Sequence, residues 1–347
     1  MVIMGGTGVA LPPAASQAEL WSGYFAAHYP GRVAPIAEKI FSNAGVRTRQ
    51  AAVSPLDEDV SGWSTERRMR RYQEEAMPLG KEAVERALVA SGLAATDVGL
   101  FAVCSCTGYA TPGLDILLAR DLGMSPRTQR LFIGHMGCYA ALPGLGAISD
   151  FVTSRGRPAL LLCAELTSLH IQPPAARLET QQVVSHALFG DAAVAVVVRP
   201  EQRGGYAVRE IAALTDPTTA DHMSWEVTDL GFRMGLSARV PQVLARHVRP
   251  MVDELLAAHD LTVADVDGWA VHPGGPRILE TVERRLDLPE TALATSRAVL
   301  DAHGNCSSAT VLLILDALRR SPAPPRRVLA LAFGPGLTLY AVLLELV

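Results

Sequence analysis

The sequence predicts an α/β protein made of two similar halves, residues 1–202 and 203–347. In each half, a segment with helical periodicity leads through a short polar turn into an apolar, strand-like run. This pattern occupies residues 80–104 in the first half and residues 249–272 in the second. The alternation of strand and helix in both halves favours a layered α/β fold in which the two units share one core.

The spacing between the two halves is constant. The Asp-Val pair at residues 97–98 recurs at residues 265–266, which is 168 positions later. The same offset carries the strand-like run 159–163 onto residues 327–331 without a gap. Two repeats are too few for a solenoid, so we expect the halves to pack face to face. The first half is longer between about residues 21 and 73, and we interpret this excess as an elaboration near the functional site.

The bulk composition narrows the class of protein. Apolar residues make up 49% of the chain and charged residues 19%. No run of about 18 or more apolar residues occurs, so we expect no membrane span. The N-terminal segment lacks the features of a signal peptide, so we expect a cytoplasmic protein. A net charge of −4 argues against nucleic acid as a partner.

Cysteine and arginine usage adds two further expectations. The five cysteines include no C-x-x-C pair, which argues against both a disulfide framework and a metal site. That pattern leaves room for one reactive thiol. The basic run Arg-Arg-Met-Arg-Arg at residues 67–71 could meet phosphate, but we interpret it as the solvated face of a helix.

Cys138 is the first candidate for chemistry. It lies in the run GHMGCYAALPG at residues 134–144, between a strand-like segment and a helical one. Pro143 is compatible with that helix only in or near the first turn. The sulfur is then expected at a helix N-terminus, where free N–H groups and the helix dipole favour the thiolate. An ordinary buried cysteine at the end of a strand is the alternative.

Two more polar residues stand at comparable turns. His272 ends an apolar run and precedes the rigid turn Pro-Gly-Gly-Pro at residues 273–276. Such a turn fixes the direction of the ring, as a general base or a hydrogen-bond donor requires. Asn305 lies in the glycine turn HGNCSSAT at residues 303–310, which opens a helix. On these residues alone, His272 could be part of the structural hydrogen bonding and Asn305 a helix cap.

Taken together, four motifs resemble those of the type III polyketide synthases, the chalcone-synthase-like enzymes of the thiolase superfamily. They occur in the family's order, at residues 134–144, 272–276 (HPGGP), 304–309 (GNCSSA) and 333–338 (FGPGLT). Further similarity covers residues 46–49 (VRTR), 163–167 (CAELT) and 187–191 (ALFGD). The resemblance spans most of the chain. It implies a thiolase-like, duplicated αβαβα layered fold, which is consistent with the repeat.

The resemblance also implies a mechanism. The family transfers acyl groups by iterative decarboxylative condensation of malonyl-CoA onto an acyl-CoA starter, followed by cyclisation. Cys138 would attack the starter thioester, aided by the helix N-terminus and an ion pair with protonated His272. His272 and Asn305 would then stabilise the enolate that forms when CO2 leaves. The CoA thioesters are substrates, no cofactor or metal is expected, and a homodimer is implied.

The resemblance further assigns residues to the substrate cavity. Phe189 matches the gatekeeper aromatic at the junction of the CoA tunnel and the cavity, with core packing as the alternative. The other cavity positions come from several segments: Cys106, Thr111, Thr167, His170, Ser185, Trp225, Met234, Ser307, Gly334 and Pro335. The matching region also supplies candidates for binding the CoA phosphates: Lys39, Arg47 and Arg49.

Several cavity positions differ from those of the plant chalcone-forming enzymes. Cys106 and His170 replace threonines, and Met234 replaces a second gatekeeper phenylalanine. Thr111 stands where a methionine crosses to the partner subunit, and Trp225 stands at a usual glycine. These differences argue against a chalcone product. The pattern is more similar to the bacterial branch, whose products are alkylpyrones, resorcinols or small phenolics.

Other classes share parts of these features. A β-ketoacyl carrier-protein synthase III has the same fold and a Cys-His-Asn triad, but not the HPGGP and GNCSS motifs. A hydroxymethylglutaryl-CoA synthase would need a catalytic glutamate before its cysteine, and none is evident. A catalytically silent acyl-CoA binder of thiolase fold is opposed by the intact triad. A papain-like hydrolase has its cysteine near the chain start, unlike Cys138.

Overall fold

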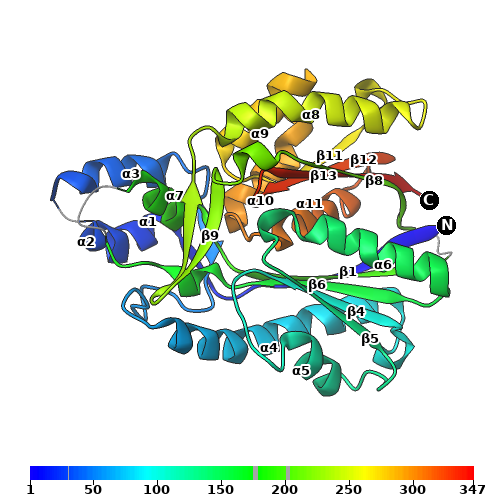
Figure 1. Ribbon diagram of the computed structural model, residues 1–347, viewed down its shortest axis with the longest axis horizontal. Helices are drawn as coiled ribbons and strands as arrows, with labels where there is room; N and C mark the ends of the chain where they lie inside the picture. Colours follow the sequence, from blue (N-terminus) through cyan, green and yellow to red (C-terminus); the bar gives the residue numbers. More distant parts are fainter. Residues whose placement is uncertain (30, 175–178, 201–203) are drawn as a thin grey trace.

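Helix and sheet layers alternate through the molecule. The computed structural model describes residues 1–347 apart from residues 30, 175–178 and 201–203. Figure 1 shows α8 and α9 outside one sheet layer, α4 and α5 outside the other, and α6 and α11 between the two. The bounds of these helices are α4 (Thr65–Ser91), α5 (Leu114–Asp121), α6 (Ala141–Arg155), α8 (Val240–Ala257), α9 (Pro276–Leu286) and α11 (Ala309–Arg319).

The strands of both layers belong to one mixed sheet. Within the described residues, nine strands run in the order β11-β12-β13-β8-β1-β7-β6-β4-β5. The two layers join where β1 meets β8 through only two residue pairs, Ile3–Ala207 and Met4–Tyr206. The strand bounds are β1 (Val2–Ala10), β4 (Leu100–Ser105), β5 (Gln129–Gly134), β6 (Ala159–Glu165), β7 (Ala192–Pro200), β8 (Tyr206–Thr215), β11 (Gly268–Val271), β12 (Arg327–Gly334) and β13 (Thr338–Leu346).

The two halves repeat the same strand arrangement. In the first half β1 is antiparallel to β7, β7 is antiparallel to β6, and β6 is parallel to β4. In the second half β8, β13, β12 and β11 are related in the same way. Among the described residues, β5 has no counterpart in the second half. The structure is therefore a duplicated α/β fold of the layered kind that was expected.

The 168-residue offset holds for whole elements. Strands β4 and β11 begin at Leu100 and Gly268, and strands β6 and β12 begin at Ala159 and Arg327. The central helices α6 and α11 begin at Ala141 and Ala309, again 168 positions apart. The predicted boundary between residues 202 and 203 lies outside the described residues, so it stays a prediction.

Burial explains why the central elements read as apolar runs. All residues of β4 and β6 are buried, as expected for strands covered on both faces. Nine of the eleven residues of α11 are buried, which fits a helix enclosed between two sheets. None of the helices in the described part of the chain is both long and apolar enough to cross a membrane.

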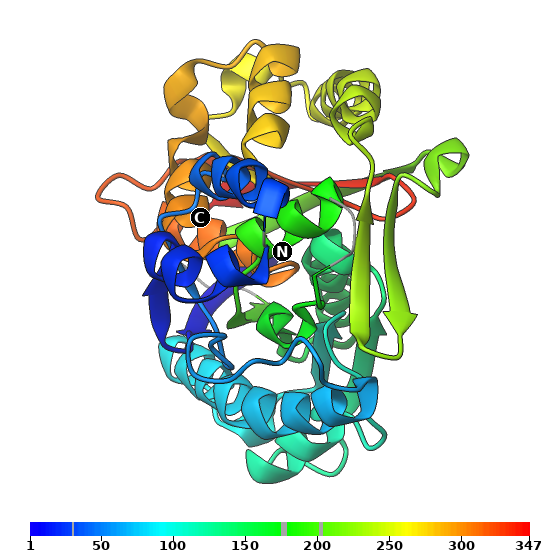
Figure 2. The same ribbon diagram turned by 90° about the vertical axis from the view of Figure 1, so that its left-hand side faces the viewer.

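The additional segments of the chain gather at one end of the layers. Figure 2 looks onto this end, where the N-terminal helices, α7 and the β9–β10 hairpin stand around the strand ends. The bounds of these elements are β2 (Ala14–Ser16), α1 (Gln17–Leu20), α2 (Ala26–His28), α3 (Ala34–Ser42), β3 (Thr48–Gln50), α7 (Thr180–Leu188), β9 (Met223–Thr228), β10 (Gly231–Leu236) and α10 (Ala294–His303).

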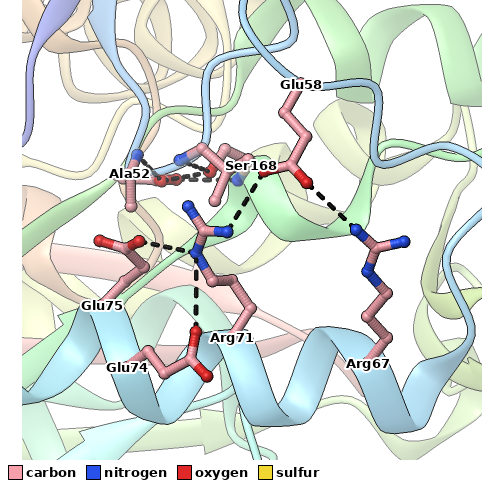
Figure 3. A network of polar contacts seen from close by, with 9 residues as sticks. Ala52, Glu58, Arg67, Arg71, Glu74, Glu75 and Ser168 are labelled. Atoms are coloured by element: carbon pink, nitrogen blue, oxygen red, sulfur yellow. Dashed lines mark hydrogen bonds and ion pairs between the residues drawn. The ribbon is translucent and has the colours of Figure 1, made fainter.

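The basic run at the start of α4 is divided between surface and core. Arg67 and Arg71 lie on the solvated face, where both pair with Glu58 and Arg71 also pairs with Glu75 (Figure 3). Arg68, in contrast, is fully buried and donates to four backbone carbonyls. The solvated-face interpretation therefore holds for Arg67 and Arg71 and is wrong for Arg68, which points into the protein.

Candidate active site

Cys138 lies at the junction of β5 and α6. A single 3₁₀ turn, Gly137–Tyr139, holds it just before the helix begins. The chain reverses through two residues with positive φ, His135 at 63° and Gly137 at 72°. A Cβ on Gly137 would lie only 3.0 Å from Pro335, so both the positive φ and the close packing favour glycine. Pro143 falls in the first turn of α6, as predicted.

Asn305 approaches Cys138 from the other half of the molecule. The Sγ atom of Cys138 lies 3.9 Å from Oδ1 and 4.0 Å from Nδ2 of Asn305. The Oδ1 atom also accepts a hydrogen bond from the backbone N–H of Ser307, at 2.9 Å. That bond fixes the orientation of the amide and leaves its NH2 group available. The side chain is thus bonded to the turn before α11 while it also faces the thiol.

Backbone pairing links Asn305 to the segment that carries Phe189. The N–H of Asn305 donates to Leu188 at 2.8 Å, and the N–H of Gly190 donates to Asn305 at 3.1 Å. These bonds form an isolated parallel bridge between Phe189 and Asn305. The expected gatekeeper and the catalytic candidate therefore share one rigid contact.

His272 follows β11 and is almost completely buried. Its backbone N–H donates to Leu331 at 2.8 Å, which continues the ladder with β12. Within the described part of the chain, neither ring nitrogen has a hydrogen-bond partner. Burial lowers the pKa of His272 to about 3. The ring is therefore neutral at pH 7, which differs from the protonated partner that was expected.

Burial also dominates at the thiol. It raises the pKa of Cys138 to about 11, although hydrogen bonds from Ser307 and Asn305 act in the opposite direction. The helix-terminus argument favoured a thiolate, but desolvation of the charged form has the larger effect. Both shifts favour the uncharged forms of the Cys138 thiol and the His272 ring in the free site.

Cys138 opens onto a small cavity of about 370 Å³. Eight of the predicted site residues line it: Cys106, Cys138, Thr167, Phe189, Trp225, Met234, Ser307 and Pro335. Four residues that the sequence analysis did not assign complete the wall: Thr107, Gly137, Met223 and Ser224.

A second cavity of about 480 Å³ lies beside the first. Its walls include two predicted residues, His170 and Ser185, which do not line the cavity at Cys138. Thr167, Phe189 and Trp225 line both cavities. The N-terminal elaboration contributes Phe25 and Arg49 to the second cavity, as expected for an addition near the site.

His170 and Trp225 attach the β9–β10 hairpin to the strand ends. The indole N–H of Trp225 donates to the carbonyl of Cys106 at 2.8 Å. The Nδ1 atom of His170 accepts from the N–H of Phe232 at 2.9 Å, so the proton lies on Nε2, which donates to Thr107 at 2.6 Å. Burial lowers the pKa of His170 to about 3. His170 is therefore a neutral brace between two segments of the cavity wall.

Glu165 is the main polar residue that the sequence analysis left without a role. It ends β6 and is fully buried. Its carboxylate accepts hydrogen bonds from the Cys106 N–H at 3.0 Å, from Thr107 at 2.9 Å and from Ser308 at 2.5 Å. Burial raises its pKa. The sequence did contain a signal for Glu165, which is an acidic residue at the end of an apolar strand. A carboxylate at such a position is expected to be buried and therefore to need hydrogen-bond donors around it.

Two predicted cavity residues occupy other positions. Thr111 is exposed on the loop after β4 and lines neither cavity. Its expected role at a partner subunit therefore stays a prediction. Gly334 ends β12, and a Cβ there would lie 2.5 Å from the ring of Tyr139. Gly334 thus allows the Pro335 turn to pack against the turn that carries Cys138.

The candidates for binding CoA phosphates differ in exposure. Lys39 is exposed on α3. Arg47 is also exposed, at 69% of its side chain, and pairs with Asp301 at 3.0 Å. Arg49 is only 7% exposed, and its Nη1 donates to the carbonyl of Phe189 at 2.8 Å. Arg49 lines the second cavity but is buried away from the surface, so its assignment to the CoA phosphates stays a prediction.

Comparison with known proteins finds relatives over most of the chain. The chalcone and stilbene synthase family matches the chain over two domains, the N-terminal one at residues 56–201 and the C-terminal one at residues 209–347. A 1,3,6,8-tetrahydroxynaphthalene synthase of Streptomyces peucetius is 35% identical over 91% of this chain and 85% of the relative. An alpha-pyrone synthesis polyketide synthase-like protein of Mycobacterium tuberculosis, Pks18, is 31% identical over 89% of this chain and 82% of the relative.

The fold is also similar to those of solved polyketide synthase structures. PKS-I of the brown alga Ectocarpus siliculosus superposes with a TM-score of 0.93 at 29% identity, covering 100% of this chain and 98% of the other. The 1,3,6,8-tetrahydroxynaphthalene synthase of Streptomyces coelicolor superposes with a TM-score of 0.92 at 30% identity, covering 99% of each chain.

The duplicated layers and these structural neighbours define an enzyme of thiolase-like fold. The chain belongs to the chalcone and stilbene synthase family, and it is a type III polyketide synthase, an acyltransferase. The alternatives of a carrier-protein synthase III, a hydroxymethylglutaryl-CoA synthase and a papain-like hydrolase are thereby set aside. Members of the family use CoA thioesters as substrates. Within the described residues, no cluster of three or more His, Cys, Asp or Glu side chains could hold a metal ion.

The raised pKa of Cys138 predicts how the free enzyme reacts with iodoacetamide. Because only the thiolate is nucleophilic, alkylation of Cys138 should accelerate as the pH rises from 7 to about 10. Cys106 is more exposed, but burial and Glu165 raise its pKa well above that of an ordinary thiol, so it should react more slowly. Peptide mapping over a pH series measures both rates. A rate that is already maximal near pH 7 would contradict the neutral thiol.

Proposed function

We propose that Cys138, His272 and Asn305 carry out the condensation of malonyl-CoA onto an acyl-CoA starter. The observation that carries this proposal is the oriented amide of Asn305, 4.0 Å from the Cys138 sulfur at an apolar cavity. A ring product of the pyrone or phenolic kind is supported by the names of the relatives, an alpha-pyrone synthesis enzyme and tetrahydroxynaphthalene synthases.

Loading of the starter begins from the neutral site. The Cys138 sulfur attacks the thioester carbonyl of the acyl-CoA, and the neutral His272 ring accepts the thiol proton as the S–C bond forms. Collapse of the tetrahedral intermediate breaks the bond to the CoA sulfur, and that sulfur leaves with the proton from His272. The starter is then held as a thioester on Cys138. A neutral imidazole suits this step, because it has a free nitrogen to accept the proton.

Chain extension uses Asn305 and His272 as hydrogen-bond donors. The Asn305 NH2 group and a ring N–H of His272 would bond the thioester oxygen of malonyl-CoA, where negative charge develops as CO2 leaves. The enolate carbon then attacks the acyl carbon on Cys138, and the Cys138 sulfur departs. The chain, now two carbons longer and attached to CoA, can return to Cys138. Donors without a negative charge are needed here, since a carboxylate at position 305 would repel the enolate.

The remaining cavity residues are proposed to control space. Phe189 lines both cavities and would form the gate between them. Trp225 is fixed in place by its bond to Cys106, so its indole would limit the volume available to the growing chain. Lys39 remains a candidate for binding the CoA phosphates, and Arg47 would have to leave Asp301 to do so.

A homodimer is proposed from the free edge of the sheet. β5 is the last strand in the sheet order, and its Leu131 and Phe132 side chains are 38% and 39% exposed. Tyr109 and Ile116 expose further apolar surface on nearby elements. An edge strand of this kind is a ready partner for the same strand of a second copy. That pairing would also bring Thr111 towards the partner, in line with the family resemblance.

A cytoplasmic location is proposed on chemical grounds. All five cysteines are unpaired, which suits a reducing compartment. The proposed substrates, malonyl-CoA and acyl-CoA, are intracellular metabolites. We also propose that no cofactor beyond these CoA thioesters takes part, because each bond change above is completed by the three side chains.

The role of Asn305 predicts a separation of two activities. Asn305→Ala should slow CO2 release from malonyl-CoA by roughly 10²-fold or more, the effect expected for loss of one oxyanion donor. Acylation of Cys138 by the starter should persist, because Cys138 and His272 remain. The measurements are the release of labelled CO2 and the mass of the intact protein. Asn43→Ala is the matched control, since Asn43 is the only other asparagine and is exposed at the end of α3.

Undiminished CO2 release from Asn305→Ala would contradict the proposed role of the amide. A wild-type chain that binds acyl-CoA but neither becomes acylated nor releases CO2 would instead favour the catalytically silent binder.

The exposed apolar residues of edge strand β5 predict the behaviour of Phe132→Glu. A charge on β5 should split the dimer, because pairing of two copies would bring two carboxylates into an apolar contact. Sedimentation velocity should then give half the mass of the wild type. Val89→Glu is the control, because Val89 is exposed on α4 away from β5. A wild type that sediments as a monomer, or a dimeric Phe132→Glu, would contradict this interface.

A further inference from the structure

Three short segments that are distant in sequence meet beside the site. They are residues 47–50, which we call the β3 clasp, residues 188–191, which carry Phe189, and residues 301–305, which carry Asn305. The last two segments are joined by the Phe189–Asn305 bridge. The β3 clasp contacts both of them.

The clasp is hydrogen-bonded to the end of α10 at successive positions. The N–H of Arg47 donates to Asp301 at 2.8 Å, and the hydroxyl of Thr48 donates to the carbonyl of Ala302 at 2.8 Å. The side chain of Gln50 bonds Nδ1 of His303 at 3.1 Å. Gly304 and Asn305 are the next two residues of the chain, so the clasp fixes the backbone immediately before Asn305.

The clasp also holds the segment that carries Phe189. The guanidinium of Arg49 donates to the carbonyl of Phe189 at 2.8 Å, and the carbonyl of Gln50 accepts from the N–H of Asp191 at 3.0 Å. The Asp191 carboxylate in turn accepts from the N–H groups of Ala52 and Ser168, each at 2.8 Å. Figure 3 shows Ala52 and Ser168 close together in this network. Both sides of Phe189 are thus anchored.

Packing leaves no free space between the three segments. A Cβ on Gly190 would lie 2.3 Å from the carbonyl oxygen of His303, and one on Gly304 would lie 2.5 Å from that of Leu188. The Cβ of Arg49 is the next contact at both places, at 3.2 and 3.5 Å. A shift of one segment therefore displaces the others.

Arg49 is the unusual member of the clasp because its charge is buried. Its guanidinium carbon lies 5.6 Å from the centre of the Phe25 ring and 5.9 Å from that of Phe41, so both rings contribute cation–π attraction. Its Nε and Nη2 atoms have no hydrogen-bond partner within the described residues. Burial lowers its pKa to about 10, and the nearby Asp191 acts in the opposite direction. Among the described residues, the one hydrogen bond of this buried cation goes to the carbonyl of Phe189.

We propose that Arg49 is a positioning residue that holds the Phe189 carbonyl and, through the Phe189–Asn305 bridge, sets the place of the catalytic amide. This inference rests on the proposed roles of Phe189 and Asn305. Burying a cation is costly, and a single bond to a neutral carbonyl does not offset that cost as a matched ion pair would. The buried charge of Arg49 is explained if it fixes the positions of Phe189 and the Asn305 amide together.

The test compares Arg49→Met with Arg199→Met. Arg199 is a matched control, because its guanidinium also donates to a backbone carbonyl, that of Ser91 at 2.9 Å, and its Nε also has no partner among the described residues. Arg49→Met should lower kcat for malonyl-CoA decarboxylation by roughly tenfold with little change in KM, since a misplaced amide weakens transition-state stabilisation. The rate of alkylation of Cys138 should change less than about twofold. Within the described residues, the clasp makes no hydrogen bond to the turn that carries Cys138. Arg199→Met should leave both rates unchanged.

A readout independent of activity is hydrogen exchange. The N–H groups of Gly190 and Asn305 are protected by the bridge, so their peptides should exchange faster in Arg49→Met than in Arg199→Met. Arg49→Lys, which keeps the charge and most of the reach, should restore part of both the rate and the protection. If Arg49→Met fails to fold, the comparison of Arg49→Lys with the wild type carries the test.

The outcomes separate this inference from the proposed function. Unchanged exchange at Gly190 and Asn305 in folded Arg49 variants would overturn the positioning role, whatever their activity. Faster exchange without any loss of decarboxylation would also overturn it, because the amide would then not depend on the clasp. A wild-type enzyme without CO2 release would count against the proposed function, while the exchange data would still decide whether the clasp holds the bridge.

Discussion

The bridge between Phe189 and Asn305 is the contact on which the site depends. It joins a segment of the first half to a turn of the second half through two backbone hydrogen bonds. Cys138 and Asn305 stand in the turns that precede α6 and α11, two helices that correspond to each other at the 168-residue offset. The duplication thereby brings Cys138 and Asn305 within 4.0 Å, although 167 positions separate them. Neither half can form this arrangement alone.

Burial then determines the pKa values of Cys138 and His272. The thiol and the imidazole are both deprived of water, and their pKa values move apart, to about 11 and about 3. Both shifts favour the uncharged forms, as expected for titratable groups that are buried away from water. Glu165 has its carboxylate satisfied by backbone and hydroxyl donors. The surrounding cavity wall is thus held rigidly by buried polar contacts.

The sequence was informative wherever the signal is local or periodic. The 168-residue offset predicted the duplicated layers. The glycine turns predicted that Cys138 and His272 follow strands and that Asn305 lies in a turn before a helix, as they do. The cavity residues Cys106, Thr167 and Ser307 came from family resemblance, and the structure places them beside Cys138.

The remaining features depend on partners that are distant in the chain. Arg49 looks like a surface cation in the run VRTR, and only the packing of Phe25 and Phe41 over it explains its burial. His170 was predicted as a cavity residue, yet its role as a brace requires Thr107 and Phe232. The raised pKa of Cys138, which acts against the predicted thiolate, has the same kind of origin. A helix terminus is visible in the sequence, whereas the loss of water around the sulfur is a property of the folded chain.

The central claim is that Cys138 carries the acyl chain while malonyl units are added to it. The most direct test is to incubate the wild-type enzyme with an acyl-CoA starter and isotope-labelled malonyl-CoA. Mass spectrometry would then follow both the Cys138 peptide and the released products. We expect an acyl group on Cys138 and products that contain the starter plus more than one labelled two-carbon unit. An acyl group found on another cysteine, or release of the unextended starter acid alone, would contradict it.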